Sequence, residues 1–106
     1  MKARTRRTVA ALKRQLHCVY GPRLRYLILY GSQARGDADR YSDIDVLVVL
    51  TGPVRPGDEI ARVGGMVADL SLRTDSVITP LFIDEDRYLN RAGPLLRNIR
   101  REGVIL

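Results

Sequence analysis

Apolar side chains recur every three or four residues near the N-terminus, which predicts an amphipathic helix over residues 5–20. The apolar positions of this pattern are Val9, Leu12, Leu16 and Val19. Thr5 and Thr8 are both suitable N-caps, and Gly21-Pro22 ends the pattern. The helix should pack its apolar face on the rest of the chain, with Cys18 as a small buried side chain.

A second helical pattern follows residues 51–57, a loop with two prolines and two glycines. Its apolar positions are Ile60, Val63, Val67 and Leu70. Asp58 is the expected N-cap. Gly64-Gly65 in the middle costs about 1 kcal/mol per glycine relative to alanine. Close packing against a sheet would explain these glycines.

Three apolar runs bounded by turn residues predict β-strands over residues 24–30, 43–50 and 76–83. The second run is apolar on both faces apart from its two aspartates, which predicts a central strand. Pro80 in the third run indicates an edge strand or a bulge.

The remaining segments are short. Residues 32–36 predict one helical turn, and residues 37–42 predict a polar loop. Asp84 is the expected N-cap of a last helical segment, which Gly93-Pro94 interrupts and which resumes over residues 95–101.

Two strands in succession, then a helix leading to a third strand, predict a small mixed β-sheet with helices packed on it. This is an α+β fold. The 106 residues predict a single domain over residues 1–106, with no room for a second, separate substrate-binding domain.

The formal net charge is +6, and 16 of the 18 basic residues are arginines. They cluster at the two ends of the chain, as Lys2, Arg4, Arg6, Arg7, Lys13 and Arg14, then Arg91, Arg97, Arg100 and Arg101. Such a charge favours polyanions, nucleotides or acidic protein surfaces as partners, although solvated helix faces explain single arginines equally well. The short apolar runs and the single cysteine predict a cytoplasmic protein that does not enter a membrane.

Two aspartates stand one residue apart where the central strand begins. Asp43 and Asp45 share one face of that strand, with α-carbons roughly 6.6 Å apart. Two such carboxylates repel each other unless a cation lies between them. The pair favours a hard cation, Mg²⁺ or alternatively Mn²⁺, which leaves coordination positions for phosphate oxygens. Taken alone, the pair is equally typical of solvent-facing residues at a strand end.

The turn before this strand strengthens the metal hypothesis. Gly31 allows the backbone to approach a ligand closely, and Ser32 offers a hydroxyl and an N–H group at the start of a helical turn. Arg35 adds a positive charge, or forms a structural salt bridge to Asp37 or Asp39. A phosphate-binding turn followed by a metal-binding pair is typical of a site for a nucleoside triphosphate and a metal.

The stretch Gly-Ser-Gln-Ala-Arg-Gly at residues 31–36, followed by Ser-Asp-Ile-Asp at residues 42–45, resembles a family signature. It is similar to the motif of the polymerase-β-like nucleotidyltransferase superfamily, in the form found in its minimal nucleotidyltransferase (MNT) group. That group includes the MntA-type antitoxins of HEPN–MNT toxin–antitoxin systems. Residues 75–80 and 94–103 also resemble tails of the group.

The resemblance implies transfer of AMP from ATP to an acceptor hydroxyl, with release of pyrophosphate. It assigns Gly31 and Ser32 to the triphosphate and Asp43 and Asp45 to the metals. A third carboxylate from a neighbouring strand normally completes the group. Asp75, at the start of the third strand, is the best-placed candidate. Asp69, on a helix, and residues 84–86, past the far end of the strand, are less suitable.

The resemblance also implies a partner. Small members of the group act as antitoxins by adding AMP to a HEPN-domain toxin, so the expected acceptor is a hydroxyl, such as that of tyrosine, on this partner in a hetero-oligomer. The alternatives are a non-catalytic nucleotide-binding antitoxin that neutralises the toxin by binding, and transfer to a small molecule. The charge of +6 disfavours a polycationic small molecule. Direct nucleic-acid binding is compatible with the charge but is not the favoured interpretation.

Overall fold

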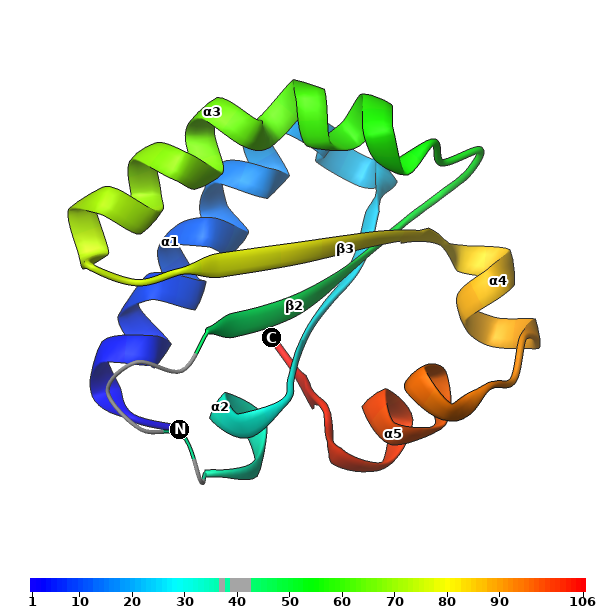
Figure 1. Cartoon of the computed structure of the whole chain (residues 1–106). Helices are drawn as coiled ribbons and strands as arrows, with labels where there is room; N and C mark the ends of the chain where they lie inside the picture. Colours follow the sequence, from blue (N-terminus) through cyan, green and yellow to red (C-terminus); the bar gives the residue numbers. More distant parts are fainter. Residues whose placement is uncertain (37, 39–42) are drawn as a thin grey trace.

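A four-stranded sheet forms the centre of the protein (Figure 1). The computed structural model describes residues 1–36, 38 and 43–106. The strands are β1 (Leu24–Tyr30), β2 (Ile44–Leu50), β3 (Ile78–Asp84) and β4 (Val104–Ile105), in the order β3-β2-β1-β4. β1 is antiparallel to both of its neighbours, whereas β2 and β3 are parallel. The predicted mixed sheet and α+β fold are therefore confirmed.

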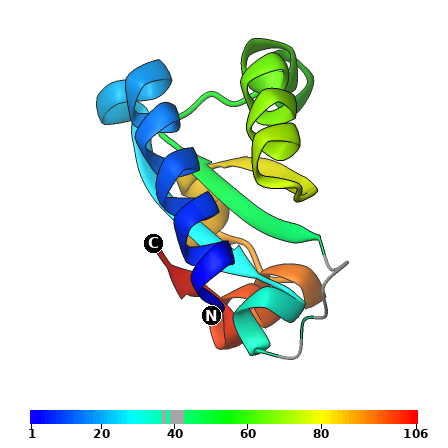
Figure 2. The same ribbon diagram turned by 90° about the vertical axis from the view of Figure 1, so that its left-hand side faces the viewer.

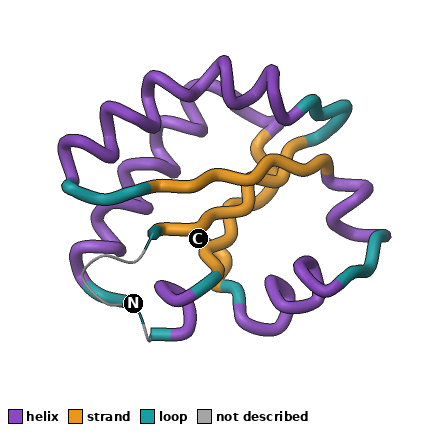
Figure 3. The backbone as a smooth tube through the Cα atoms, in the orientation of Figure 1, coloured by secondary structure: helices purple, strands orange, loops and turns teal. Residues whose placement is uncertain are grey.

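Helices cover the two faces of this sheet (Figures 2 and 3). α1 (Ala3–Tyr20) and α3 (Pro56–Thr74) pack on one face, where their apolar side chains join a core that includes Leu29, Val46 and Val48. α4 (Glu85–Asn90) and α5 (Pro94–Glu102) contribute to a smaller cluster on the other face. The 3₁₀ turn η1 (Gly21–Arg23) joins α1 to β1, and the short α2 (Ser32–Arg35) follows β1.

The order of strands confirms two predictions from the apolar pattern. β2 lies between β1 and β3, and its residues from Val46 to Leu50 are fully buried. β3 lies at an edge of the sheet, which accommodates Pro80 because an edge strand has a side without ladder hydrogen bonds. The two-residue strand β4 was not predicted, because a pair of apolar residues gives no periodic signal.

The start of α1 differs from the prediction. The helix begins at Ala3, and Thr5 and Thr8 are buried residues inside it rather than N-caps. The Thr8 hydroxyl donates a hydrogen bond to the carbonyl oxygen of Arg4. Cys18 and Val19 are exposed, so the helix buries a narrower face than the pattern indicated.

α3 departs from the prediction in three ways. The helix begins at Pro56 with Arg55 as its N-cap residue, so Asp58 lies in the first turn and is not the cap. Ile60 is 53% exposed and does not join the core. A Cβ atom added to Gly64 or Gly65 would meet no atom within 4 Å, so close packing does not explain this glycine pair.

Asp84 caps α4 as predicted, because its carboxylate accepts a hydrogen bond of 2.8 Å from the N–H group of Arg87. α5 begins at Pro94, which confirms the interruption at Gly93-Pro94. The loop predicted over residues 37–42 lies, apart from Ala38, outside the described residues. Among the described residues, the helices are too short or too polar for any of them to span a membrane.

Candidate active site

The antiparallel pairing of β1 and β2 brings the two motifs of the signature together. β1 ends where β2 begins, and Tyr30, the last residue of β1, is the register partner of Asp45. Gly31 and Ser32 follow directly, so the turn and the aspartate pair meet at the same end of the sheet (Figure 1). Residues 14 positions apart in the sequence thereby become neighbours.

Gly31 lies directly against the carboxylate of Asp45. Its backbone has a φ of 76°, in the region that only glycine adopts readily. A Cβ atom built on Gly31 would lie 2.6 Å from Oδ2 of Asp45, too close for any side chain. Glycine is required here for both reasons.

The electrostatics of the aspartate pair fit a bound cation. Asp45 alternates with Leu47 and Val49, so it points to the face of the sheet that α4 and α5 partly cover. Burial raises the pKa of Asp45, and the negative charge of Asp43 raises it further. The pKa of Tyr30 is also raised, first by burial and then by the charge of Asp45. A cation would relieve this accumulated negative charge, and carboxylate oxygens are the ligands that Mg²⁺ and Mn²⁺ prefer.

α2 is fixed to its surroundings through two side chains. Gln33 is buried, and its Oε1 accepts a hydrogen bond of 2.9 Å from the hydroxyl of Thr5 in α1. Arg35 forms an ion pair of 3.5 Å with Glu102 of α5. The salt bridges considered from the sequence, to Asp37 or Asp39, concern residues outside the described part of the chain. Ser32, the first residue of α2, is therefore carried by a turn that is connected to both faces of the sheet.

The structure does not bring Asp75 to this pair. Asp75 occupies the C-cap of α3 with a φ of 50°, three residues before β3 begins its pairing with β2. Its side chain is 89% exposed and forms an ion pair of 3.4 Å with Arg4. Within the described residues, no three Asp, Glu, His or Cys side chains gather closely enough to hold a metal ion. On β3, Thr79 is the register partner of Asp45.

Three of the other acidic candidates also have structural partners. Asp69 forms an ion pair with Arg73 one helical turn away, and Asp84 pairs with Arg87. Glu85, the residue after Asp84, forms an ion pair of 3.0 Å with Arg25. These contacts explain the three side chains without a metal.

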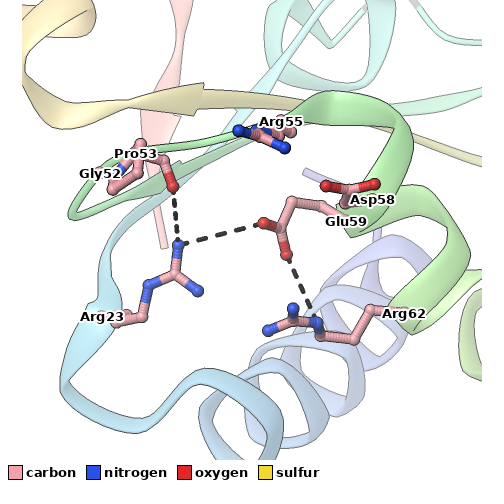
Figure 4. Close-up of a pocket in the computed structure, with 7 residues that line it drawn as sticks. All are labelled: Arg23, Gly52, Pro53, Arg55, Asp58, Glu59 and Arg62. Atoms are coloured by element: carbon pink, nitrogen blue, oxygen red, sulfur yellow. Dashed lines mark hydrogen bonds and ion pairs between the residues drawn. The ribbon is translucent and has the colours of Figure 1, made fainter.

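A pocket of about 370 Å³ lies at the opposite end of β1 and β2 (Figure 4). It is lined by Arg23, Gly52, Pro53, Arg55, Asp58, Glu59 and Arg62. Glu59 is 4% exposed, and it accepts a hydrogen bond of 2.8 Å from the hydroxyl of Tyr20. Arg23 and Arg62 lie 4.0 and 3.7 Å from its two carboxylate oxygens. Burial, followed by this hydrogen bond to Glu59, raises the pKa of Tyr20.

This network was not evident from the sequence, because Tyr20 and Glu59 are 39 residues apart. The one signal that could have indicated part of it is the helical spacing of Glu59 and Arg62, which the sequence analysis did not use. The cations around Glu59 balance a buried carboxylate, so the network has a structural role away from the aspartate pair.

Comparison with known proteins agrees with this geometry. Residues 21–102 match the nucleotidyltransferase domain family, which includes the turn, the aspartate pair and all of β1, β2 and β3. The chain belongs to this family. The predicted nucleotidyltransferase fold is thereby confirmed.

Two relatives from Methanocaldococcus jannaschii carry the provisional name protein adenylyltransferase. The first, MJ1305, is 34% identical over 76% of this chain and 56% of its own length. The second, MJ0141, is 31% identical over 73% of this chain and 86% of its own length. The chain thus spans little more than half of the first relative.

Solved structures show the same fold. A toxin–antitoxin complex with AMP-PNP contains a chain with a TM-score of 0.60 and 24% identity, covering 88% of this chain and 68% of that one. The complex of the triply AMPylated HEPN toxin of Shewanella oneidensis with its MNT antitoxin gives a TM-score of 0.57 at 19% identity, covering 95% and 70%. At these identities the likeness establishes the fold alone.

Proposed function

We propose that this protein is a metal-dependent nucleotidyltransferase that transfers AMP from ATP to a hydroxyl group of a partner protein. The observation that carries the proposal is the contact of Gly31 with the Asp45 carboxylate. It places a glycine-serine turn, suited to phosphate, directly against a carboxylate pair suited to a divalent cation. The family match and the names of the two archaeal relatives support the reaction class.

Asp43 and Asp45 would hold the metal, Mg²⁺ or Mn²⁺, through their carboxylate oxygens. When bound, this metal neutralises negative charge on the phosphates of ATP. Gly31 and Ser32 would hold the triphosphate, because the backbone is accessible at Gly31 and Ser32 supplies a hydroxyl beside it. Arg35 would add positive charge at the same turn. ATP binding should therefore require the divalent cation, since two carboxylates otherwise face the phosphates.

We propose Asp75 as the third carboxylate of the site, and a variant of this residue tests the assignment. It would have to exchange its ion pair with Arg4 for a position beside Asp43 and Asp45. Asp75→Asn should reduce transfer at least about a hundredfold if it serves in this way, a range common for a lost catalytic acid or base. An exposed pair such as Asp75–Arg4 contributes little stability, so the variant should remain folded.

We further propose that the partner is a HEPN-type toxin in the cytoplasm and that the two proteins form a hetero-oligomer. The acceptor of AMP is a tyrosine hydroxyl of the toxin. The addition of AMP inactivates the toxin, so this protein acts as its antitoxin. The support is the likeness to chains from toxin–antitoxin complexes, one of which contains a HEPN toxin and an MNT antitoxin. We also propose that residues 1–106 act as one minimal domain, so the partner must supply the acceptor group. The position of Asp75, outside the aspartate pair, favours one alternative: a non-catalytic nucleotide-binding antitoxin that neutralises the toxin by binding.

Intact mass spectrometry of the co-expressed partner separates the two functions. Incubation of this protein with ATP, Mg²⁺ and the HEPN-type partner should add the mass of AMP to the partner, and peptide mapping should place it on tyrosine. Chelator should abolish the addition. If the two proteins form a complex that inhibits the toxin while the partner mass never changes, the non-catalytic alternative is correct.

A further inference from the structure

Positive charge is segregated along this chain. Residues 1–36 contain nine of the 18 Lys and Arg residues and no Asp or Glu, whereas all 12 acidic residues follow from position 37 onward. Most of the early cations lie on or beside α1, which contains no acidic residue. α1 also lies outside residues 21–102, so the family match does not account for this charge.

The helix geometry gathers four of these cations on one side of α1. With 3.6 residues per turn, Arg6, Arg7, Lys13 and Arg14 fall within an arc of about 120°. The buried residues Leu12 and Leu16 point the opposite way, toward the sheet. Arg7 and Arg14 form one row and Arg6 and Lys13 a second, with about 10.5 Å along the helix between the members of each row. We refer to these four residues as the basic strip.

In the part of the chain that the structure describes, the basic strip has no counter-charge. Among the described residues, none of its four side chains has a carboxylate within 4 Å or a hydrogen-bond partner. Three other arginines at the chain ends are already engaged. Arg4 binds Asp75, Arg100 donates to the Arg91 carbonyl, and Arg101 donates to Asn98.

The chemistry of the basic strip fits phosphate groups better than a protein surface. Its exposed centre is Ala10, and no aromatic or large apolar side chain lies between the cations. Stable protein interfaces contain an apolar core with few charges, which this face lacks. Single-stranded nucleic acid is bound with aromatic side chains that stack on the bases, and these are also absent. Duplex nucleic acid offers phosphates at high linear charge density and needs only cations to bind its backbone.

We propose that the basic strip of α1 is a docking surface for the phosphate backbone of double-stranded nucleic acid, recognised without regard to base sequence. This activity goes beyond the proposed transfer reaction and uses none of its residues. The strip lies on the α1 and α3 side of the sheet, whereas Asp45 points to the α4 and α5 side. Both activities can therefore be present in one molecule, and either can be lost alone.

The test measures binding of a fluorescein-labelled 20-base-pair DNA duplex by anisotropy between 50 and 200 mM salt. Arg7→Gln/Arg14→Gln should weaken binding about tenfold at 50 mM and lower the slope of log affinity against log salt by about 1.8, the value for two lost phosphate contacts. Arg91→Gln/Arg97→Gln is the matched control. It removes the same charge from two exposed arginines far from α1, and it should leave the slope unchanged.

Thermal melts check that each variant is folded, and pyrophosphate release measures its transfer activity separately from DNA binding. Both variants should melt like the wild type and retain its transfer activity. Equal losses of binding in the two variants would overturn the proposal, because net charge alone would then explain the affinity. Tighter binding of polyglutamate or of the single strand than of the duplex would also overturn it. A wild type that binds duplex without any transferase activity supports the docking surface and contradicts only the proposed function.

Discussion

At the scale of single residues, the candidate site depends on one contact. Gly31 and Asp45 fit together because glycine has no side chain and its φ of 76° turns the backbone toward the carboxylate. The same contact places Asp45 in a partly buried position, where burial and the charge of Asp43 raise its pKa. The contact therefore affects both the transfer reaction and the dependence of stability on pH.

Replacing Asp43 and Asp45 by asparagine should abolish transfer while the fold survives. Metal binding and phosphate positioning are lost together, so the rate should fall by several orders of magnitude. Pyrophosphate release measures this loss, and circular dichroism checks the fold. A folded double variant that transfers AMP at the wild-type rate would rule out the metal site.

The same aspartates predict a dependence of stability on pH. The pKa of Asp45 is raised in the folded state, so its contribution to stability is present below the unfolded pKa of about 3.9 and is lost as the pH rises through the folded value. In metal-free buffer, Asp45→Asn should therefore gain stability relative to the wild type at pH 7 but not at pH 3. Urea unfolding at both values tests this. A difference that does not change with pH would contradict it.

Gly31→Ala tests the contact itself. The new Cβ atom would lie 2.6 Å from Oδ2 of Asp45 and would force the carboxylate away, in addition to the strain of a positive φ. Gly36→Ala is the matched control, because Gly36 has a φ of 83° but open space around its Cα. Both variants should lose stability, whereas only Gly31→Ala should abolish transfer. Equal transfer rates in the two variants would show that the contact is dispensable.

At the scale of elements, α2 is too short to hold its own position. Helices of four residues are not stable alone, so α2 depends on the Thr5–Gln33 hydrogen bond to α1 and on the Arg35–Glu102 ion pair to α5. The first of these links is buried and the second is partly exposed, so the hydrogen bond should contribute more to stability.

Thr5→Val should loosen α2 and weaken ATP binding. Valine keeps the shape of threonine but cannot donate to Gln33, which should cost about 1–3 kcal/mol of unfolding free energy. Thr8→Val is the control, since the Thr8 hydroxyl donates to a carbonyl of its own helix and not to α2. Calorimetry should show weaker ATP binding for Thr5→Val alone. Unchanged ATP affinity in a destabilised Thr5→Val protein would show that α2 is held in other ways.

At the scale of the whole molecule, the two ends of the β1–β2 pair have different roles. One end carries the turn and the aspartates. The other carries the buried Tyr20–Glu59 hydrogen bond and the arginines beside Glu59, which Figure 4 shows. β2 spans seven residues, so the two ends are separated by roughly 20 Å. Stability and catalysis should therefore be separable by mutation.

Tyr20→Phe should reduce stability without changing the reaction. Removal of the hydroxyl leaves the buried Glu59 carboxylate without its shortest hydrogen bond, a loss of about 1–3 kcal/mol. The rate of AMP transfer, measured well below the melting temperature, should equal that of the wild type. A marked fall in this rate without unfolding would show that the two ends are coupled.

Much of the fold was determined by the sequence alone. Apolar runs located β1 and β2, and helical spacing located α1 and α3, each within a few residues, because burial depends mainly on the local pattern of apolar residues. The signature at residues 31–45 identified Gly31, Ser32, Asp43 and Asp45, because a glycine-serine turn and an aspartate pair each carry their own chemistry. These features need no knowledge of distant contacts.

Other features were decided only by the tertiary structure. The contact of Gly31 with Asp45, 14 residues apart, depends on the register of β1 and β2. The position of Asp75, which pairs with Arg4 and does not join the aspartates, depends on packing between segments 71 residues apart. Ile60, Gly64 and Gly65 were misjudged because spacing along a helix does not show which residues have neighbours: Ile60 is exposed, and a Cβ atom on either glycine would meet open space. The folded chain also decides which arginines form ion pairs and which belong to the basic strip. The interaction between two charges depends on the distance between them in space and not on their separation in the sequence.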